Sequence, residues 1–493
     1  MGARARRGNA GSDGWRVGGW KEAGRSRACT PRTTLTRTVH PHADRAPSRL
    51  GARGFRRRAS AQIYTRAVPR LTALRYMTRF RCTAGECPDT CCAGVKLMLT
   101  EADRARLVAT ADTGARRERV ARTVEAAPDL GEGYVAVLRT FEEGRCGFLD
   151  PDHLCSIQRE HGPQALPAGC DRFPRVFSRF EDRRELSATL SCPEAARLAL
   201  TAEDALDVVD VSPELFAPEP PRPDDDARPS PYSAPADAVH AAVGEVLRDA
   251  RLPVALRVAV VGELGRRTES FFHAGATGLD RAALDRELAA FRAPETIQAV
   301  AEQLTSGPWR ATQALQAVMG LMASLPDGAP PRAHLVPAAM NQYLAEAKAA
   351  YPTLGTEGGP PLWDVLWERV QVRRQFLHQS LGGALEPSYA RFLINDWHRE
   401  WYTQSPTLSA HAFKLAVRLS SVMLLAMSAP GLYRQPAPPR SEIDAVAVDA
   451  AQIYSRHVER SADVLSALEG LLTPQALGTD GFGRVATFAR LAV

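Results

Sequence analysis

Cysteine clustering constrains this 493-residue chain more than any other feature. Eight of its nine cysteines fall between residues 82 and 192, with the spacing C-x4-C-x3-C-C followed by C-x8-C-x14-C-x21-C. Proteins use cysteines for disulfides, for metal ligation or as small buried apolar side chains. The clustered residues are Cys82, Cys87, Cys91, Cys92, Cys146, Cys155, Cys170 and Cys192.

These three uses differ in what else the sequence should contain. A disulfide framework is typical of small exported domains, but this chain has ample length for a core. It also lacks the apolar stretch of about 7–15 residues that marks a secretory signal. The use of individual cysteines as ordinary apolar core residues does not account for the clustering or for the adjacent pair Cys91-Cys92. We therefore expect thiolate ligation of a soft metal or an iron–sulfur cluster.

The spacing of the cysteines also bears on which metal they bind. Thiolate ligands must converge to within about 2.3 Å of each metal ion, so the chain between them has to turn sharply. The spacers TAGE (83–86) and PDT (88–90) contain the Gly and Pro that turns use. Zinc sites typically show C-x2-C knuckles, which this sequence lacks. The pattern therefore favours an iron–sulfur cluster, expected as 4Fe–4S, with zinc as the alternative and with surplus thiols left for structure or a second metal.

The first sixty residues differ from the rest of the chain. They contain fourteen Arg and one Lys against three acidic residues, and they show no helical or strand period. We predict a disordered Arg-rich tail over residues 1–61, which a mis-assigned start codon would also explain. Because the whole chain carries a net charge of +6, the part beyond this tail is mildly acidic. The basic total is therefore no argument for nucleic-acid binding.

Three regions are predicted beyond the tail: a cysteine-cluster domain at 62–216, a Pro/Asp-rich linker at 217–237 and a helical domain at 238–493. The linker contains PEPPRPDDDARPSPYSAPAD, which cannot continue a helix or a sheet. The expected fold class is mainly α, with an irregular cysteine-rich cluster-binding region followed by an all-helical domain. Helical periods recur over 239–273, 282–292, 296–304, 310–325, 337–351, 361–378, 389–402 and 445–472.

The longest apolar stretch, residues 408–430, has the length of a membrane span. It contains His411, Lys414 and Arg418 at helical spacing, which favours a buried core helix over a span. We therefore expect no membrane partner. With neither a span nor a signal, the protein is expected in the cytoplasm, where thiols stay reduced.

Four sequence blocks within the cysteine-rich region carry a family resemblance. The blocks are FRCTAGECPDTCCAG (80–94), CGFL with LCSIQREHG (146–149 and 154–162), CDRFPR (170–175) and SCPEAAR (191–197). In their order and spacing they resemble the flagellin lysine-N-methylases, within the broader CxxCxxCC cysteine-cluster proteins.

The match has departures and limits. Gly85 stands one place late, Pro88 replaces the usual acidic residue and Asp171 takes the place of an Arg in the family pattern. The helical half agrees more loosely, through YARFLINDWHREW and IYSRHVERSADVL. The resemblance thus covers roughly residues 62–472 and excludes the tail.

The resemblance implies an enzyme that transfers methyl groups from S-adenosylmethionine to lysine side chains of flagellin. It also implies that the eight clustered cysteines hold an iron–sulfur cluster and that flagellin is the protein partner. The alternative is a non-catalytic protein whose zinc or iron–sulfur site only stabilises the fold or carries metal.

Methyl transfer to lysine requires a neutral amine, and free lysine has a pKa of about 10.4. A nearby base is therefore expected, and the acidic residues inside the cysteine blocks are candidates for it. We single out Asp89 and Glu194, with Asp150 and Asp171 as further candidates, although each also fits an ordinary turn or helix-cap position. Because the chain lacks the glycine-rich fingerprint of doubly wound methyltransferases, the cofactor-binding residues are left unassigned.

Overall fold

The computed structural model describes part of the chain. Every described residue belongs to one compact unit, which begins at Arg66. The predicted tail at 1–61 and residues 217–234 of the predicted linker lie outside the described residues, so these two assignments stay predictions. The described ranges are 70–94, 97–127, 133–179, 183–216, 235–273, 280–307, 310–323, 332–402, 405–459 and 481–492.

A four-stranded sheet is built from both ends of the cysteine-rich region. Its strand order is β5-β6-β1-β7, with β1 parallel to β6 and the other two neighbouring pairs antiparallel. Apolar residues at the strand ends, such as Leu74 and Leu186, are fully buried, which fixes the register of the sheet. The strands are β1 (Arg70–Leu74), β5 (Arg175–Arg179), β6 (Arg183–Ala188) and β7 (Val208–Asp210), accompanied by α1 (Tyr76–Arg79) and α6 (Pro193–Thr201).

Residues 97–172 form a small lobe that enters the chain between α1 and β5. It has its own sheet, in the order β2-β4-β3, and its own apolar cluster around Leu99, Leu107 and Phe148. At its first helix, Thr100 and Asp103 form a capping box that satisfies the free N–H groups. Its elements are β2 (Met98–Thr100), α2 (Glu101–Ala109), α3 (Gly114–Thr123), β3 (Val124–Ala126), β4 (Tyr134–Leu138), α4 (Ser156–His161) and α5 (Ala168–Arg172).

The sequence predicts an irregular cysteine-rich region, and the structure gives it more regular elements than expected. The strands in this part are only three to six residues long. Strands of this length show too few alternations for a period of two to stand out among turn residues. The two sheets are therefore a feature that hydrophobic periodicity did not indicate.

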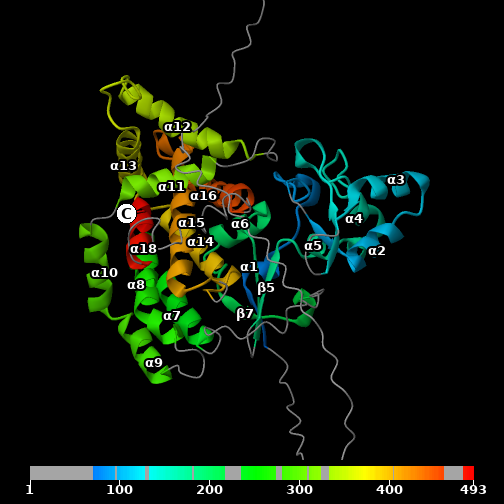
Figure 1. The fold of residues 1–493 in the computed structure, drawn as a ribbon, viewed down its shortest axis with the longest axis horizontal. Helices are drawn as coiled ribbons and strands as arrows, with labels where there is room; N and C mark the ends of the chain where they lie inside the picture. Colours follow the sequence, from blue (N-terminus) through cyan, green and yellow to red (C-terminus); the bar gives the residue numbers. More distant parts are fainter. Residues whose placement is uncertain are drawn as a thin grey trace, which may run out of the picture. The chain divides into compact units, whose positions relative to one another are not determined.

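The C-terminal part is helical, and the chain is mainly α, as predicted (Figure 1). Within the described residues, the predicted helical periods lie on observed helices, with the break near residue 252 falling between α7 and α8. Residues 324–325 and 460–472 of two of these periods lie outside the described residues, so there the helices stay predictions. The helices are α7 (Ala236–Arg248), α8 (Val254–His273), α9 (Arg281–Ala290), α10 (Pro294–Ser306), α11 (Ala311–Ala323), α12 (Leu335–Ala350), α13 (Leu362–Leu381), α14 (Glu386–Arg399), α15 (Leu408–Ser428), α16 (Arg440–Ile453) and α18 (Gly481–Ala489).

One large apolar core connects the four-stranded sheet to these helices. It includes Leu186 of β6 and Ala195 of α6 together with Val258 of α8 and Phe413 of α15. Helices α14 and α16 pack against α6, and α14 also packs against β6 (Figure 1). Apolar contacts therefore join the parts of the chain that precede and follow the predicted linker at 217–237.

Helix α15 is long and apolar enough to cross a membrane by length and composition, but 89% of its most apolar window is buried inside the protein. It packs against α8, α16 and α18. Its buried Arg418 pairs with Asp396 of α14 at 2.6 Å and with Glu400 at 2.5 Å. A buried charge needs such partners, and this agrees with the predicted core helix.

Candidate metal centre in the cysteine-lined cavity

The structure brings the clustered cysteines together around one cavity of about 600 Å³. All eight are free thiols rather than disulfides. Cys146 does not line the cavity, but its backbone N–H donates to the carbonyl oxygen of Cys92 at 2.7 Å. The seven cysteines that line it are Cys82, Cys87, Cys91, Cys92, Cys155, Cys170 and Cys192. Segments more than 100 residues apart in sequence therefore meet here, as ligation of a shared metal or cluster requires.

The first four cysteines lie on a tight loop after α1. The backbone N–H of Ala84 points at the sulfur of Cys82, 3.4 Å away, and a single 3-10 turn over Ala84–Glu86 follows. Gly94 ends the loop at φ +67°, a conformation that favours glycine, and its N–H donates to Gly144 at 2.8 Å. This pairing fixes the loop against the segment that leads to Cys146.

Two of the later cysteines stand directly before helices. Cys155 precedes α4 and Cys192 precedes α6, whose first residue is Pro193. Backbone N–H groups at each helix start donate to these two sulfurs. Such N–H groups and the positive end of the helix dipole stabilise a thiolate, which is the form that binds a metal. Cys170 lies within the short helix α5.

The thiols also act on one another. The single S–H proton of Cys92 lies within hydrogen-bonding reach of the sulfurs of both Cys91 and Cys155, and this interaction lowers the pKa of each of them. Burial raises the pKa of Cys146 to about 11 and that of Cys192 to about 12. The donor set is thus sulfur throughout and includes two thiols whose pKa is lowered. It fits a soft metal ion or an iron–sulfur cluster, whose binding would displace the remaining thiol protons.

A clamp from the C-terminal helices holds the loop with the adjacent cysteines. The clamp consists of Gln452 at the end of α16 and of Arg456 and His457 in the π-helix Tyr454–Val458 that follows. Arg456 donates to the carbonyl oxygens of Thr90, at 2.7 Å, and of Ala93. π-Helical turns occur frequently at functional sites, and this one places a buried cation beside Cys91.

The clamp also binds Asp89, one of the two carboxylates singled out as a base. Gln452 donates to its Oδ2 at 2.7 Å, and Nε2 of His457 lies 3.4 Å from the same oxygen. Burial would raise the pKa of Asp89, but the hydrogen bond to His457 and the charge of Arg456 outweigh it, so the pKa is lowered. Asp89 lines the cavity, yet its contacts hold it as an ionised anchor of the loop.

The other predicted base, Glu194, is not among the residues that line the cavity. Its carboxylate pairs with Arg197 one turn along α6, at 2.7 and 2.8 Å. Asp150 pairs with Arg119 at 2.9 Å and with Arg159, while Asp171 lines the cavity. The catalytic roles of these carboxylates stay predictions.

The clamp is the part of the site that sequence reasoning missed. Its residues follow the cysteine loop by more than 360 positions, and no spacing rule connects residues so far apart. The one available signal was the segment IYSRHVERSADVL, which carried only the looser part of the family resemblance.

Comparisons with known proteins bear on the family. No family model matches the chain, and no solved structure matches it. A lysine-N-methylase from Salmonella typhimurium is 30% identical over 142 residues, and one from Salmonella choleraesuis is 29% identical over 142 residues. A flagellar biosynthetic protein FliU from Salmonella muenchen is 28% identical over 134 residues.

These matches cover 27% of this chain. They span 32% of the length of each lysine-N-methylase and 77% of the length of FliU. The resemblance drawn from the cysteine blocks is thereby confirmed by curated relatives. Over this part of its length, the chain is similar to the lysine-N-methylases.

Proposed function

We propose that the protein is an S-adenosylmethionine-dependent protein-lysine N-methyltransferase that acts on flagellin and holds an iron–sulfur cluster. One observation carries the proposal: cysteines from distant segments line one cavity in a chain whose relatives are named lysine-N-methylase. The name of the third relative, a flagellar biosynthetic protein, supports a flagellar substrate. We place the reaction in the cytoplasm, where the thiols stay reduced.

The cysteines that line the cavity would hold the cluster. Bound there, a 4Fe–4S cluster would supply a redox-active, Lewis-acidic centre. The chain's own contribution is to converge its thiolates and to fix their loop through Arg456 and Gln452. A cavity of about 600 Å³ falls within the usual range of small-molecule sites, roughly 300–1,000 Å³.

The proposed transfer is a displacement at carbon. The lone pair of the lysine Nζ forms a bond to the methyl carbon, the carbon–sulfur bond of the sulfonium breaks, and S-adenosylhomocysteine leaves as a neutral thioether. The amine has to lose its proton for this to occur, because the ammonium has no lone pair. Of the two predicted carboxylates, Asp89 is the one at the cavity wall.

A direct experiment tests the proposal. The full chain is purified without oxygen, assayed for iron and sulfide, and incubated with flagellin and S-adenosylmethionine. We expect flagellin to gain whole methyl increments by intact mass, and the gain to disappear in Cys91→Ser and Cys155→Ser variants.

The same experiment separates the alternative. A protein that contains metal and remains folded but adds no methyl groups to flagellin would support a non-catalytic metal-binding protein. A protein that binds neither iron nor zinc would contradict both functions.

A further inference from the structure

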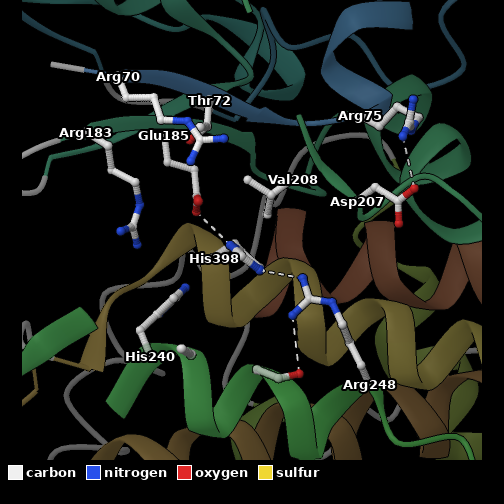
Figure 2. Close-up of a pocket in the computed structure, with 12 residues that line it drawn as sticks. Arg70, Thr72, Arg75, Arg183, Glu185, Asp207, Val208, His240, Arg248 and His398 are labelled. Atoms are coloured by element: carbon white, nitrogen blue, oxygen red, sulfur yellow. Dashed lines mark hydrogen bonds and ion pairs between the residues drawn. The ribbon is translucent and has the colours of Figure 1, made fainter. Parts of the chain in front are cut away.

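A second cavity of about 600 Å³ lies between the four-stranded sheet and helices α7 and α14 (Figure 2). It contains none of the clustered cysteines. Four arginines line it against two carboxylates: Arg70, Arg75, Arg183 and Arg248 against Glu185 and Asp207. Its lining therefore carries an excess of positive charge.

Strand register places two of these arginines side by side. In the parallel pair of β1 and β6, Arg70 lies opposite Arg183 and Thr72 lies opposite Glu185. Like charges on directly opposite residues destabilise a sheet unless something negative lies between them. Arg70 pairs with Asp210 at 2.5 Å and Arg183 with Asp237 at 3.0 Å, but both carboxylates are more than half exposed. Exposed ion pairs contribute little to stability.

A hydrogen-bonded relay along one wall of the cavity joins Arg248, which is exposed, to the buried side chains of His398 and Glu185 (Figure 2). Arg248 lies 2.8 Å from Nε2 of His398, and Nδ1 of His398 lies 2.6 Å from Oε1 of Glu185. Because a guanidinium has no acceptor, Nε2 must accept the hydrogen bond from Arg248. The proton of His398 therefore lies on Nδ1 and is donated to Glu185. Glu185 is thus hydrogen-bonded to His398 rather than to Arg248, and the guanidinium group of Arg248 lines the cavity.

Burial lowers the pKa of two lining groups, and nearby cations lower that of His240 further. Burial lowers the pKa of Arg248, and the charges of Glu185 and Asp207 offset this only in part. Burial also lowers the pKa of His240 well below its usual range, and the nearby Arg183 adds to that shift. Stacking on Trp401, with ring centroids 4.3 Å apart, holds His240 in place.

The same geometry argues against a metal ion. Ligand atoms of Glu185, His240 and His398 lie within 4.8 Å of one another, which is close enough for coordination. A metal on Nδ1 of His398 would move the proton to Nε2, directly against the N–H of Arg248. A metal on Nε2 would have to displace Arg248 and enter a positive field. The cavity is therefore better suited to an anion.

We propose that this cavity binds a small molecule through an anionic group, a carboxylate or a phosphate, held by Arg183 and Arg248. Guanidinium groups bind both kinds of anion in a bidentate manner. One source of such a group is the methionine carboxylate of S-adenosylmethionine, and the other is a phosphate-bearing metabolite. The inference does not require that the protein methylate lysine.

The test is calorimetric titration of the full chain with three probes: inorganic phosphate, methionine and S-adenosylmethionine. Saturable binding of at least one probe is expected. Arg248→Met should weaken it on the order of 10- to 100-fold, the effect of one lost charge-assisted hydrogen bond. Arg183→Met gives a second measurement that leaves the relay of Arg248, His398 and Glu185 intact.

Matched controls make the outcome decisive. Arg251→Met removes a guanidinium just beyond α7 that is 87% exposed and pairs with Asp249, and it should leave binding unchanged. The Cys91→Ser variant should retain binding at the second cavity even where flagellin methylation is lost.

Loss of S-adenosylmethionine and methionine binding in both cavity variants would identify the carboxylate source. Loss of phosphate binding alone would identify the phosphate source. The inference is wrong if no probe saturates the protein, or if both cavity variants bind as tightly as the wild type.

Discussion

At the scale of single residues, His411 makes the stability of the fold depend on pH. Its side chain is 0% exposed in α15 and shares a hydrogen bond of 3.1 Å with Ser405. Burial lowers the pKa of His411 to about 4, although the nearby Glu400 acts in the opposite direction. The unfolded chain therefore takes up this proton more readily than the folded protein does.

The sign of the pH effect follows from this difference. Stability is full above the unfolded pKa of about 6.5 and falls as the pH drops towards about 4. For this residue alone we expect a loss of about 2 kcal/mol in the free energy of unfolding between about pH 7.5 and pH 5, measured by urea titration. His411→Gln can keep the bond to Ser405 and should remove this share of the loss. His378→Gln, at an exposed position in α13, should not, and identical pH profiles for both variants would contradict the argument.

Residue-level reasoning reaches furthest where the chemistry of one residue type is sufficient. The clustered cysteines stand out by density alone, and the structure places seven of the eight at one cavity, while their role as metal ligands stays a prediction. Asp89 and Glu194 were singled out only because they neighbour cysteines, and the helix geometry of α6 directs Glu194 to Arg197 instead. Side-chain direction depends on the three-dimensional path of the backbone, which sequence proximity does not supply.

At the scale of elements, the π-helix at Tyr454–Val458 connects the helical part to the cysteine loop. Arg456→Met would remove the hydrogen bonds to Thr90 and Ala93, so we expect a cost of about 2–3 kcal/mol in stability and less metal bound per chain. Arg456→Lys keeps the charge but not the planar fork, so metal content should be intermediate. Iron analysis and the absorption spectrum of the purified protein measure the effect.

Arg440→Met is the matched control for this prediction. Arg440 stands at the start of α16 in a partly exposed pair with Asp444, so its loss should change stability by less than about 0.5 kcal/mol. Wild-type metal content in Arg456→Met would show that the clamp does not position the cysteines.

Element prediction was strongest for helices and weakest for strands. The predicted period at 361–378 corresponds to α13, which ends before Gly382 at φ +56°, the left-handed position that a glycine C-cap uses. Strand β2 consists only of Met98–Thr100, and a three-residue strand has no periodicity of its own. Its pairing with β4 depends on a partner more than 30 residues away.

At the scale of the whole molecule, apolar burial is unevenly divided between two clusters. The large core runs from the four-stranded sheet through α8, α14 and α15, whereas the small lobe has only its own limited cluster around Leu99 and Phe148. A small core offsets little conformational entropy, so small lobes commonly depend on a staple such as a metal. Cys146, Cys155 and Cys170 all belong to this lobe, and the proposed metal would tie it to the loop that holds Cys91.

Metal removal should therefore loosen the small lobe before the helical core. After anaerobic treatment with a chelator, we expect amide hydrogen exchange to speed up in the sheet β2-β4-β3 and in α4, while α8 and α15 keep their protection. The reason is mass action: a ligand that binds only the closed lobe stabilises that lobe, and its loss lowers the free energy of local opening. In Cys91→Ser the chelator should cause no further change. Equal acceleration in α8 and α15, or none in the lobe, would show that the cysteines do not hold a metal that stabilises this part of the fold.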